Sequence, residues 1–275
     1  MPPPGACDTH AHVFGPFDRY PLAADRSYTP PLAPATAHLA LLDRMGFARG
    51  VVVQASALGM DCSTLLDALD ASGGRLRGIA VADPAATEAE LESMHRRGVR
   101  GLRFTEVTVP GTGQKYKGVI GFPELERLAP RMKQLGWQAQ LWAPCDLLAR
   151  ELPRLVKLGL PLSLDHMGYF DVARGADDAA FRRVVAIAAA EGIWVKTAAL
   201  RVSKAPPDYP DVRPFFDAWL RACPRRLAWG SDWPHVRMGA SAPDVGHLVD
   251  LLMSWAGDEA ARAILCDNPA AQYGF

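Results

Sequence analysis

The sequence predicts a single-domain α/β protein, a (β/α)8 barrel that covers residues 1–275. The first reason is a phrase that recurs along the chain, in which a helix-like stretch stops at a glycine and an apolar run follows, as in LLDRMG before FARGVVVQAS and MKQLG before WQAQLWAP. The second reason is that two further apolar runs, CDTHAHV and RRLAWGSDWP, bring the expected strands to eight. Eight strands without a linker favour a barrel, because an open doubly wound sheet usually stops at about five or six.

The expected strands cover, in chain order, residues 7–13, 47–56, 75–82, 99–107, 137–144, 160–167, 193–200 and 225–234. Among the intervening helices, residues 87–97 open with a capping box from Thr87 to Glu90. Residues 178–191 follow acidic side chains that suit a helix N-terminus. The segment DEAARAILCDNPAAQYGF closes the chain as an extra helix with a tail.

Three connections are long and follow the first, fourth and seventh strands, at residues 14–34, 108–121 and 201–214. Barrels keep their active sites on the face where strands end, and long loops in a compact domain are usually functional. The loop PGTGQKYKGVIG after the fourth strand has the composition of a glycine-hinged lid. We therefore expect the site among these loops.

Composition excludes several partners. Lys and Arg total 30 and Asp and Glu also total 30, so no basic field attracts nucleic acid, and 49% of the residues are hydrophobic, which supplies a large core. No GxGxxG or GxxxxGK[ST] motif follows a strand, so nucleotide binding has no support. A small molecule is the expected partner.

The five cysteines are scattered, odd in number and lack a CxxC pair, which is typical of reduced thiols. No signal peptide and no apolar run of membrane-spanning length is present. We expect a soluble cytoplasmic protein that does not bind membranes, and we leave its oligomeric state open, a homo-oligomer included.

The candidate active residues stand where strands end: His10 and His12 in CDTHAHV, His166 in LSLDHMG, and Asp232 and His235 in GSDWPH. Imidazoles and a carboxylate at such positions either bind a metal ion, or polarise a carbonyl while the carboxylate activates water. An HxH pair alone is more often structural than functional. Together with His166 and Asp232 it favours a site.

Strand alternation places Arg103 towards the barrel interior, opposite the apolar face of its strand. A guanidinium there needs an anion, and a substrate carboxylate is the expected partner. The alternative is an internal ion pair with Asp8 or Glu106, just as Lys196 is open to an internal pair with Asp165.

The segments DTHAHVFGP, RSYTPP, VVVQAS, GLRF, DHMG, GSDWPH and DNPAAQYGF, in this order, resemble the amidohydrolase superfamily. More narrowly, they are similar to its amidohydrolase-2 branch with 2-pyrone-4,6-dicarboxylate lactonase, sugar-acid lactonases and galactarolactone isomerase. The resemblance runs from Cys7 to Phe275 and implies a hydrolase that opens a cyclic ester.

The resemblance also implies roles for single residues. Asp232 is expected to be the general base for water, while His10, His12 and His166 hold and polarise the substrate carbonyl. The expected substrate-binding residues are Arg103, Arg201, Tyr28, Gln54, Trp142, Tyr169 and His235.

Two departures from the branch concern charge. Tyr169 stands where an arginine follows DHMG, and FTEVTVPG lacks a second arginine. We therefore expect a substrate less anionic than a pyrone dicarboxylate, though still a carboxylate-bearing lactone or organic acid.

Metal is the remaining question. A binuclear centre does not fit Arg103, Gln140 and Trp142 at the matching strands, whereas His10, His12, His166 and Asp232 could hold one Zn²⁺. We prefer a site that requires no cofactor. The alternatives are a metal-dependent decarboxylase of an unsaturated or aromatic acid and a lactone isomerase. A non-catalytic binding barrel is disfavoured because every catalytic position is filled.

Overall fold

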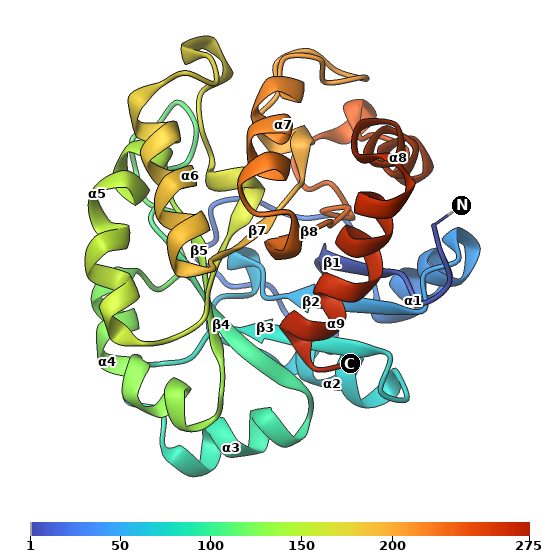
Figure 1. The fold of residues 1–275 in the computed structure, drawn as a ribbon. Helices are drawn as coiled ribbons and strands as arrows, with labels where there is room; N and C mark the ends of the chain where they lie inside the picture. The colour runs from blue at the N-terminus through green and yellow to red at the C-terminus, as the bar shows by residue number, and fades with distance from the viewer. Residues whose placement is uncertain (1) are drawn as a thin grey trace.

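The computed structural model describes residues 2–275 and confirms the barrel. Eight parallel strands pair in sequence order, each with the next (Figure 1). They are β1 (Cys7–Ala11), β2 (Arg49–Val53), β3 (Leu76–Ala80), β4 (Val99–Thr105), β5 (Gln138–Trp142), β6 (Leu162–Leu164), β7 (Trp194–Lys196) and β8 (Leu227–Ala228). The ring closes between β1 and the residues that follow β8, where the Thr9 amide donates to the Trp229 carbonyl at 2.9 Å and Ala11 pairs with Trp233.

Helices surround the sheet. They are α1 (Ala35–Met45), α2 (Ser63–Ala71), α3 (Glu88–Arg96), α4 (Phe122–Gln134), α5 (Cys145–Leu155), α6 (Ala179–Glu191), α7 (Arg213–Ala222), α8 (Val245–Arg262) and α9 (Asn268–Tyr273). The six glycines expected to stop helices all have a positive φ, between 66° and 105°, a conformation that only glycine adopts freely. They are Gly46, Gly74, Gly98, Gly136, Gly159 and Gly192. The Thr87 capping box and the Asp178 N-cap are present as well.

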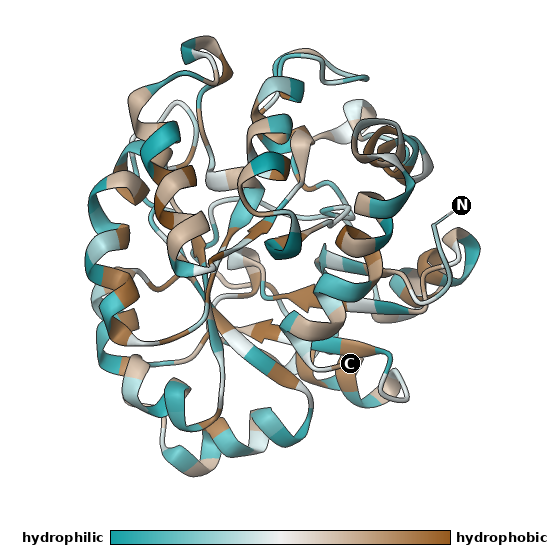
Figure 2. Ribbon diagram, viewed as in Figure 1, coloured by the Kyte–Doolittle hydropathy of each residue, from teal (hydrophilic) through white to brown (hydrophobic). Residues whose placement is uncertain are grey.

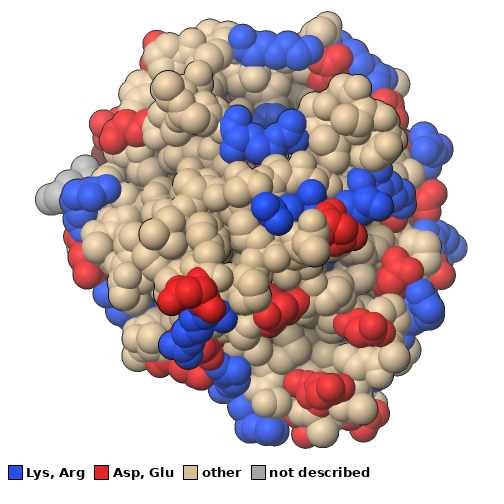
Figure 3. All heavy atoms as spheres, turned by 180° about the vertical axis from the view of Figure 1, so that it is seen from behind, with Lys and Arg blue, Asp and Glu red and all other residues tan. Residues whose placement is uncertain are grey.

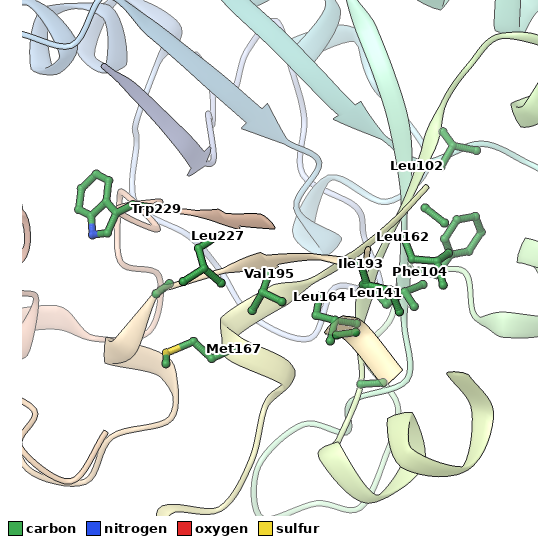
Figure 4. Packing of buried hydrophobic residues seen from close by; sticks show 14 of the residues in the cluster. Leu102, Phe104, Leu141, Leu162, Leu164, Met167, Ile193, Val195, Leu227 and Trp229 are labelled. Atoms are coloured by element: carbon green, nitrogen blue, oxygen red, sulfur yellow. The ribbon is translucent and has the colours of Figure 1, made fainter. Parts of the chain in front are cut away.

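The core lies between strands and helices. Leu102 and Phe104 of β4 point outward and are fully buried, together with Leu141, Leu164 and other apolar side chains (Figure 4). Brown, hydrophobic segments accordingly occupy the strands and the helix faces turned towards them, and teal ones the outer surface (Figure 2). Polar side chains fill the barrel interior instead, so burial there depends on pairing.

The two ends of the barrel differ. At one end α9 lies across the strands, and Tyr273 packs against Cys7, Val51 and Ile79 (Figure 1). The opposite end carries the long loops after β1, β4 and β7, as expected. A fourth long connection, residues 229–244, was missed because β8 was expected to run to residue 234, whereas it ends at Ala228. Within residues 2–275 no helix has both the length and the apolar character needed to cross a bilayer.

Candidate active site

The structure brings the four central residues together. Nε2 of His10 and Nε2 of His12 lie 3.6 and 3.4 Å from Oδ1 of Asp232. The ring of His166 lies 5.2 Å from that of His10, centre to centre. All four side chains are buried, so they interact in a medium where water screens charge poorly.

Unusual backbone conformations place two of these residues. Asp232 has φ 59° and His166 has φ 48°, in the left-handed region that costs a non-glycine residue roughly 1–2 kcal/mol. The Asp232 amide is held by the His10 carbonyl at 2.7 Å, and the carbonyl of Met167 accepts from the Trp219 indole at 3.0 Å. Strain that the surroundings enforce in this way is typical of functional sites.

Gly230 explains why the segment after β8 can approach β1 so closely. A Cβ atom at residue 230 would stand 2.5 Å from the Cβ of His10 and 2.7 Å from its amide nitrogen. Any side chain there would displace His10 from Asp232. The glycine in GSDWPH is therefore part of the geometry of the site.

Asp232 is ionised. Burial alone would raise its pKa, but Arg201, whose Nε donates to Oδ2, and the surrounding histidines hold that pKa well below its ordinary value. Burial lowers the pKa of His166 to about 4 and that of His10 well below its usual range, so these two imidazoles are neutral at pH 7. The carboxylate therefore has one oxygen on a guanidinium and the other turned to imidazoles.

Arg103 has an internal partner, but not one of the two expected. Its Nε donates to Oδ2 of Asp165 at 2.9 Å, whereas Glu106 pairs with Lys115 and Asp8 accepts from Ser231. Oδ1 of Asp165 lies 3.4 Å from Nδ1 of His10. Asp165 is thus a site residue that the sequence reading missed, although its place directly before His166 at a strand end was a signal for it.

Lys196 also lies in the centre of the site. It does not pair with Asp165, the expected partner, but contacts other groups. Nζ donates to Oε1 of Gln140 at 2.6 Å and to the Thr9 carbonyl at 2.8 Å, and it lies 3.4 Å from Nδ1 of His10. Burial lowers the pKa of Lys196 to about 8. At pH 7 Lys196 is therefore mostly protonated, and its ammonium group faces Nδ1 of His10.

The donor atoms of the site fit a single metal ion. Nδ1 of His12 lies 2.8 Å from the Val53 carbonyl, which can only accept, so this nitrogen carries a hydrogen. Nε2 then faces a carboxylate oxygen of Asp232, and a proton or a cation must lie between these two acceptors. Donor atoms of His10, His12 and Asp232 lie within 4.8 Å of one another, so this group fits one divalent ion.

A cavity of about 300 Å³ opens above the cluster. His12, His166 and Asp232 form its floor, and Arg103 and Arg201 line it as expected. Four aromatic side chains, Tyr28, Tyr116, Trp142 and Tyr169, make its walls. Trp142 stands at the centre of them, with its ring 5.3 Å from that of Tyr116 and 5.9 Å from that of Tyr169.

Two expected substrate-binding residues do not line this cavity. Gln54 donates through Nε2 to the Gly59 and Asp61 carbonyls and so holds the loop after β2. His235 directs Nε2 at the Ser231 carbonyl, 3.1 Å away, inside the loop that carries Asp232. Both side chains thus contact backbone carbonyls of loops and are absent from the lining of the cavity.

Comparison with known proteins agrees with this geometry. A family model described as Amidohydrolase matches residues 7–275. The chain is 37% identical to a 4-sulfomuconolactone hydrolase of Rhizobium radiobacter, over 99% of this chain and 91% of the relative. It is 36% identical to a 2-pyrone-4,6-dicarboxylate hydrolase of Comamonas testosteroni, over 98% and 90%.

One solved structure is similar to this chain over almost its whole length. It is that of a candidate 2-pyrone-4,6-dicarboxylic acid hydrolase of Acinetobacter baumannii with citric acid bound, at a TM-score of 0.85 and 26% identity over 98% of this chain and 100% of that one. The barrel, the strand-end histidines and aspartate, and the family match across nearly the whole chain lead to one conclusion: the protein belongs to the amidohydrolase family.

Proposed function

We propose that this protein is a hydrolase that opens the ring of a small carboxylate-bearing lactone. The observation that carries the proposal is the buried Asp232 carboxylate, surrounded by His10, His12 and His166 at the floor of an open cavity. Relatives at 36–37% identity are named as lactone or pyrone hydrolases, which supports the same chemistry here. The five buried free thiols support the cytoplasmic location.

The cavity suits a flat ring with an acidic group. Aromatic walls on several sides favour a planar, unsaturated lactone. Nη1 and Nη2 of Arg103 make no hydrogen bond within residues 2–275, and its guanidinium stacks 4.7 Å above the Trp142 ring. Those two nitrogens are available to a substrate carboxylate, while Nε stays on Asp165.

In the proposed reaction the lactone carbonyl oxygen lies against the three imidazoles, which donate hydrogen bonds as negative charge develops on it. Asp232 accepts a proton as water attacks, and a new C–O bond forms. The tetrahedral intermediate collapses with cleavage of the ring C–O bond, and the proton on Asp232 passes to the ring oxygen. Water is consumed, and a hydroxy acid or its keto tautomer leaves.

Arg201 links substrate charge to the strength of the base. In the free site it holds the pKa of Asp232 well below the ordinary range, which makes the carboxylate a weak base. A substrate carboxylate near Arg201 offsets that guanidinium and raises the basicity of Asp232 in the complex. Acidic lactones would thus be preferred in turnover as well as in binding.

Charge balance supports a site without a metal ion. The network holds three buried carboxylates and three cations, namely Asp8, Asp165, Asp232, Lys196, Arg103 and Arg201. A divalent ion would add two uncompensated charges to it. Were one bound, His10, His12 and Asp232 would hold it, and it would polarise the carbonyl as a Lewis acid. In the proposed site, a proton on Nε2 of His12 takes that place, and the network then gains one positive charge instead of two.

We expect exhaustive chelation to leave activity unchanged. Activity should also not vary with the metal content that remains in the samples. The measurement is turnover of a lactone panel, followed by proton release, alongside metal analysis of the same samples. Activity that tracks bound zinc and returns on its addition would contradict this mechanism.

Product mass separates the proposed reaction from its rivals. Hydrolysis adds one water to the substrate, isomerisation leaves the mass unchanged, and decarboxylation releases carbon dioxide. Mass spectrometry of the products of the panel, run in ¹⁸O-labelled water, should show a single labelled oxygen in the product. An unlabelled product of unchanged mass would make the protein an isomerase.

A pH profile tests Lys196 as a positioning residue. Its protonated form donates to His10, so kcat/KM should fall as pH rises through about 8, the pKa that burial gives this lysine. Lys196→Met should lower activity at all pH values and abolish this alkaline limb, after subtraction of spontaneous lactone hydrolysis. An unchanged limb in a folded variant would assign the ionisation to another group.

A further inference from the structure

Arg237 stands apart from the other cations of the cavity. It belongs to the loop after β8 and lines the cavity together with Arg103 and Arg201. Those two arginines are each paired with a buried aspartate. Arg237 is exposed at the mouth, and within residues 2–275 no carboxylate lies within 4 Å of its guanidinium.

Its one hydrogen-bond partner within residues 2–275 is a neutral group that also faces the cavity. Nη1 of Arg237 donates to the Tyr116 hydroxyl at 2.7 Å. Tyr116 comes from the loop between β4 and α4 and is buried against the rings of Tyr28 and Trp142. The contact therefore aims the guanidinium over the aromatic walls without neutralising it, and leaves its other nitrogens free to donate.

The molecular surface agrees with this arrangement. The face opposite to α9 is hollowed, and Lys and Arg side chains border the hollow, with an acidic side chain beside them on one side and most other Asp and Glu side chains farther out (Figure 3). The rim thus presents positive charge to whatever enters. A cation held in place without a counter-charge is a site for an anion.

We propose that Arg237, positioned by Tyr116, is a specificity-determining residue that binds a second oxyanion of the substrate, a carboxylate or sulfonate on a substituent remote from the lactone carbonyl. This rests on the proposed function and extends it to a substrate class, the lactone with two acidic groups. The loop after β8 supplies the guanidinium that Tyr169 and the FTEVTVPG segment lack. Such a substrate would be more anionic than the two departures from the branch led us to expect.

Binding is tested apart from catalysis, with citrate as the probe because a structural relative binds it. Titration calorimetry should show that Arg237→Met weakens citrate binding roughly tenfold or more, the loss expected for charge-assisted hydrogen bonds. Tyr116→Phe should weaken it less, since it frees the guanidinium without removing it. Lys117→Met, which removes an exposed charge next to Tyr116 in the sequence and outside the cavity lining, is the matched control and should leave citrate affinity unchanged.

Substrate assays identify the anion. KM should rise in Arg237→Met for 4-sulfomuconolactone, which carries a sulfonate and a carboxylate, and much less for muconolactone, which carries one carboxylate. An equal rise for both acids that is absent for the methyl ester of muconolactone would assign Arg237 to the first carboxylate and overturn the second site. Equal losses for acidic and ester substrates, or the same loss in Lys117→Met, would overturn the proposal. If no lactone is hydrolysed but citrate binding still depends on Arg237, the proposed reaction fails and the oxyanion site stands.

Discussion

Asp232→Asn is expected to fold normally and to lose nearly all turnover, roughly 10²- to 10⁴-fold in kcat. The amide keeps the shape of the carboxylate and can still accept from Arg201, but it cannot take a proton from water. Asparagine also tolerates the left-handed backbone, φ 59°, that residue 232 adopts. Stopped assays with a product standard, together with a thermal melt, measure both parts of the prediction.

The control is another Asp-to-Asn substitution on the same loop, at Asp244. Asp244 caps α8 by accepting from the His247 amide, and asparagine is an equally good N-cap, so Asp244→Asn should keep both stability and rate. Retention of even a tenth of the wild-type rate in Asp232→Asn would remove Asp232 from the role of base.

The barrel was predictable because its signals are local. Each glycine that stops a helix needs a positive φ within a few residues of the next strand, and alternation along β4 alone separates Arg103 from Leu102 and Phe104. The four central residues were predictable for a related reason. Parallel strands bring their ends to one face, so residues at strand ends must meet whatever their separation in sequence.

The partners of those residues were not predictable in the same way. Alternation shows that Arg103 and Lys196 point inward, but it does not show how far each strand is staggered against its neighbours. Arg103 therefore meets Asp165, and Lys196 meets Gln140, through a register that only the closed barrel fixes.

The loop after β8 could not be predicted from its sequence. The apolar residues of RRLAWGSDWP continue past the two-residue strand, so the run suggested a longer strand than the barrel contains. Its functional geometry depends instead on left-handed residues, among them Asp232, His235 and Arg237, which no periodic pattern marks. No sequence pattern therefore marks Arg237, and its role follows only from its place in the lining of the cavity.

Arg103→Met is expected to lower the free energy of unfolding at neutral pH by about 3–5 kcal/mol, because it leaves the Asp165 carboxylate buried without its guanidinium. Burial tends to raise the pKa of Asp165, and Arg103 and His10 hold it well below the ordinary value. A depressed pKa contributes stability above the unfolded-state value of about 3.9, and this is lost as pH falls through the folded pKa. The wild type therefore keeps this stability down to about pH 4 and loses it below, so the deficit of the variant should shrink as the pH falls below 4.

A second substitution separates the two roles of Arg103. Asp165→Asn removes the unpaired charge, so Arg103→Met/Asp165→Asn should recover much of the stability that Arg103→Met loses, as measured by urea unfolding. The same double variant should still show KM for an acidic lactone raised roughly 10- to 150-fold, with a smaller change for its methyl ester, since Nη1 and Nη2 no longer meet the substrate carboxylate. If KM recovers together with stability, Arg103 acts only as the partner of Asp165, and the carboxylate must bind elsewhere in the cavity.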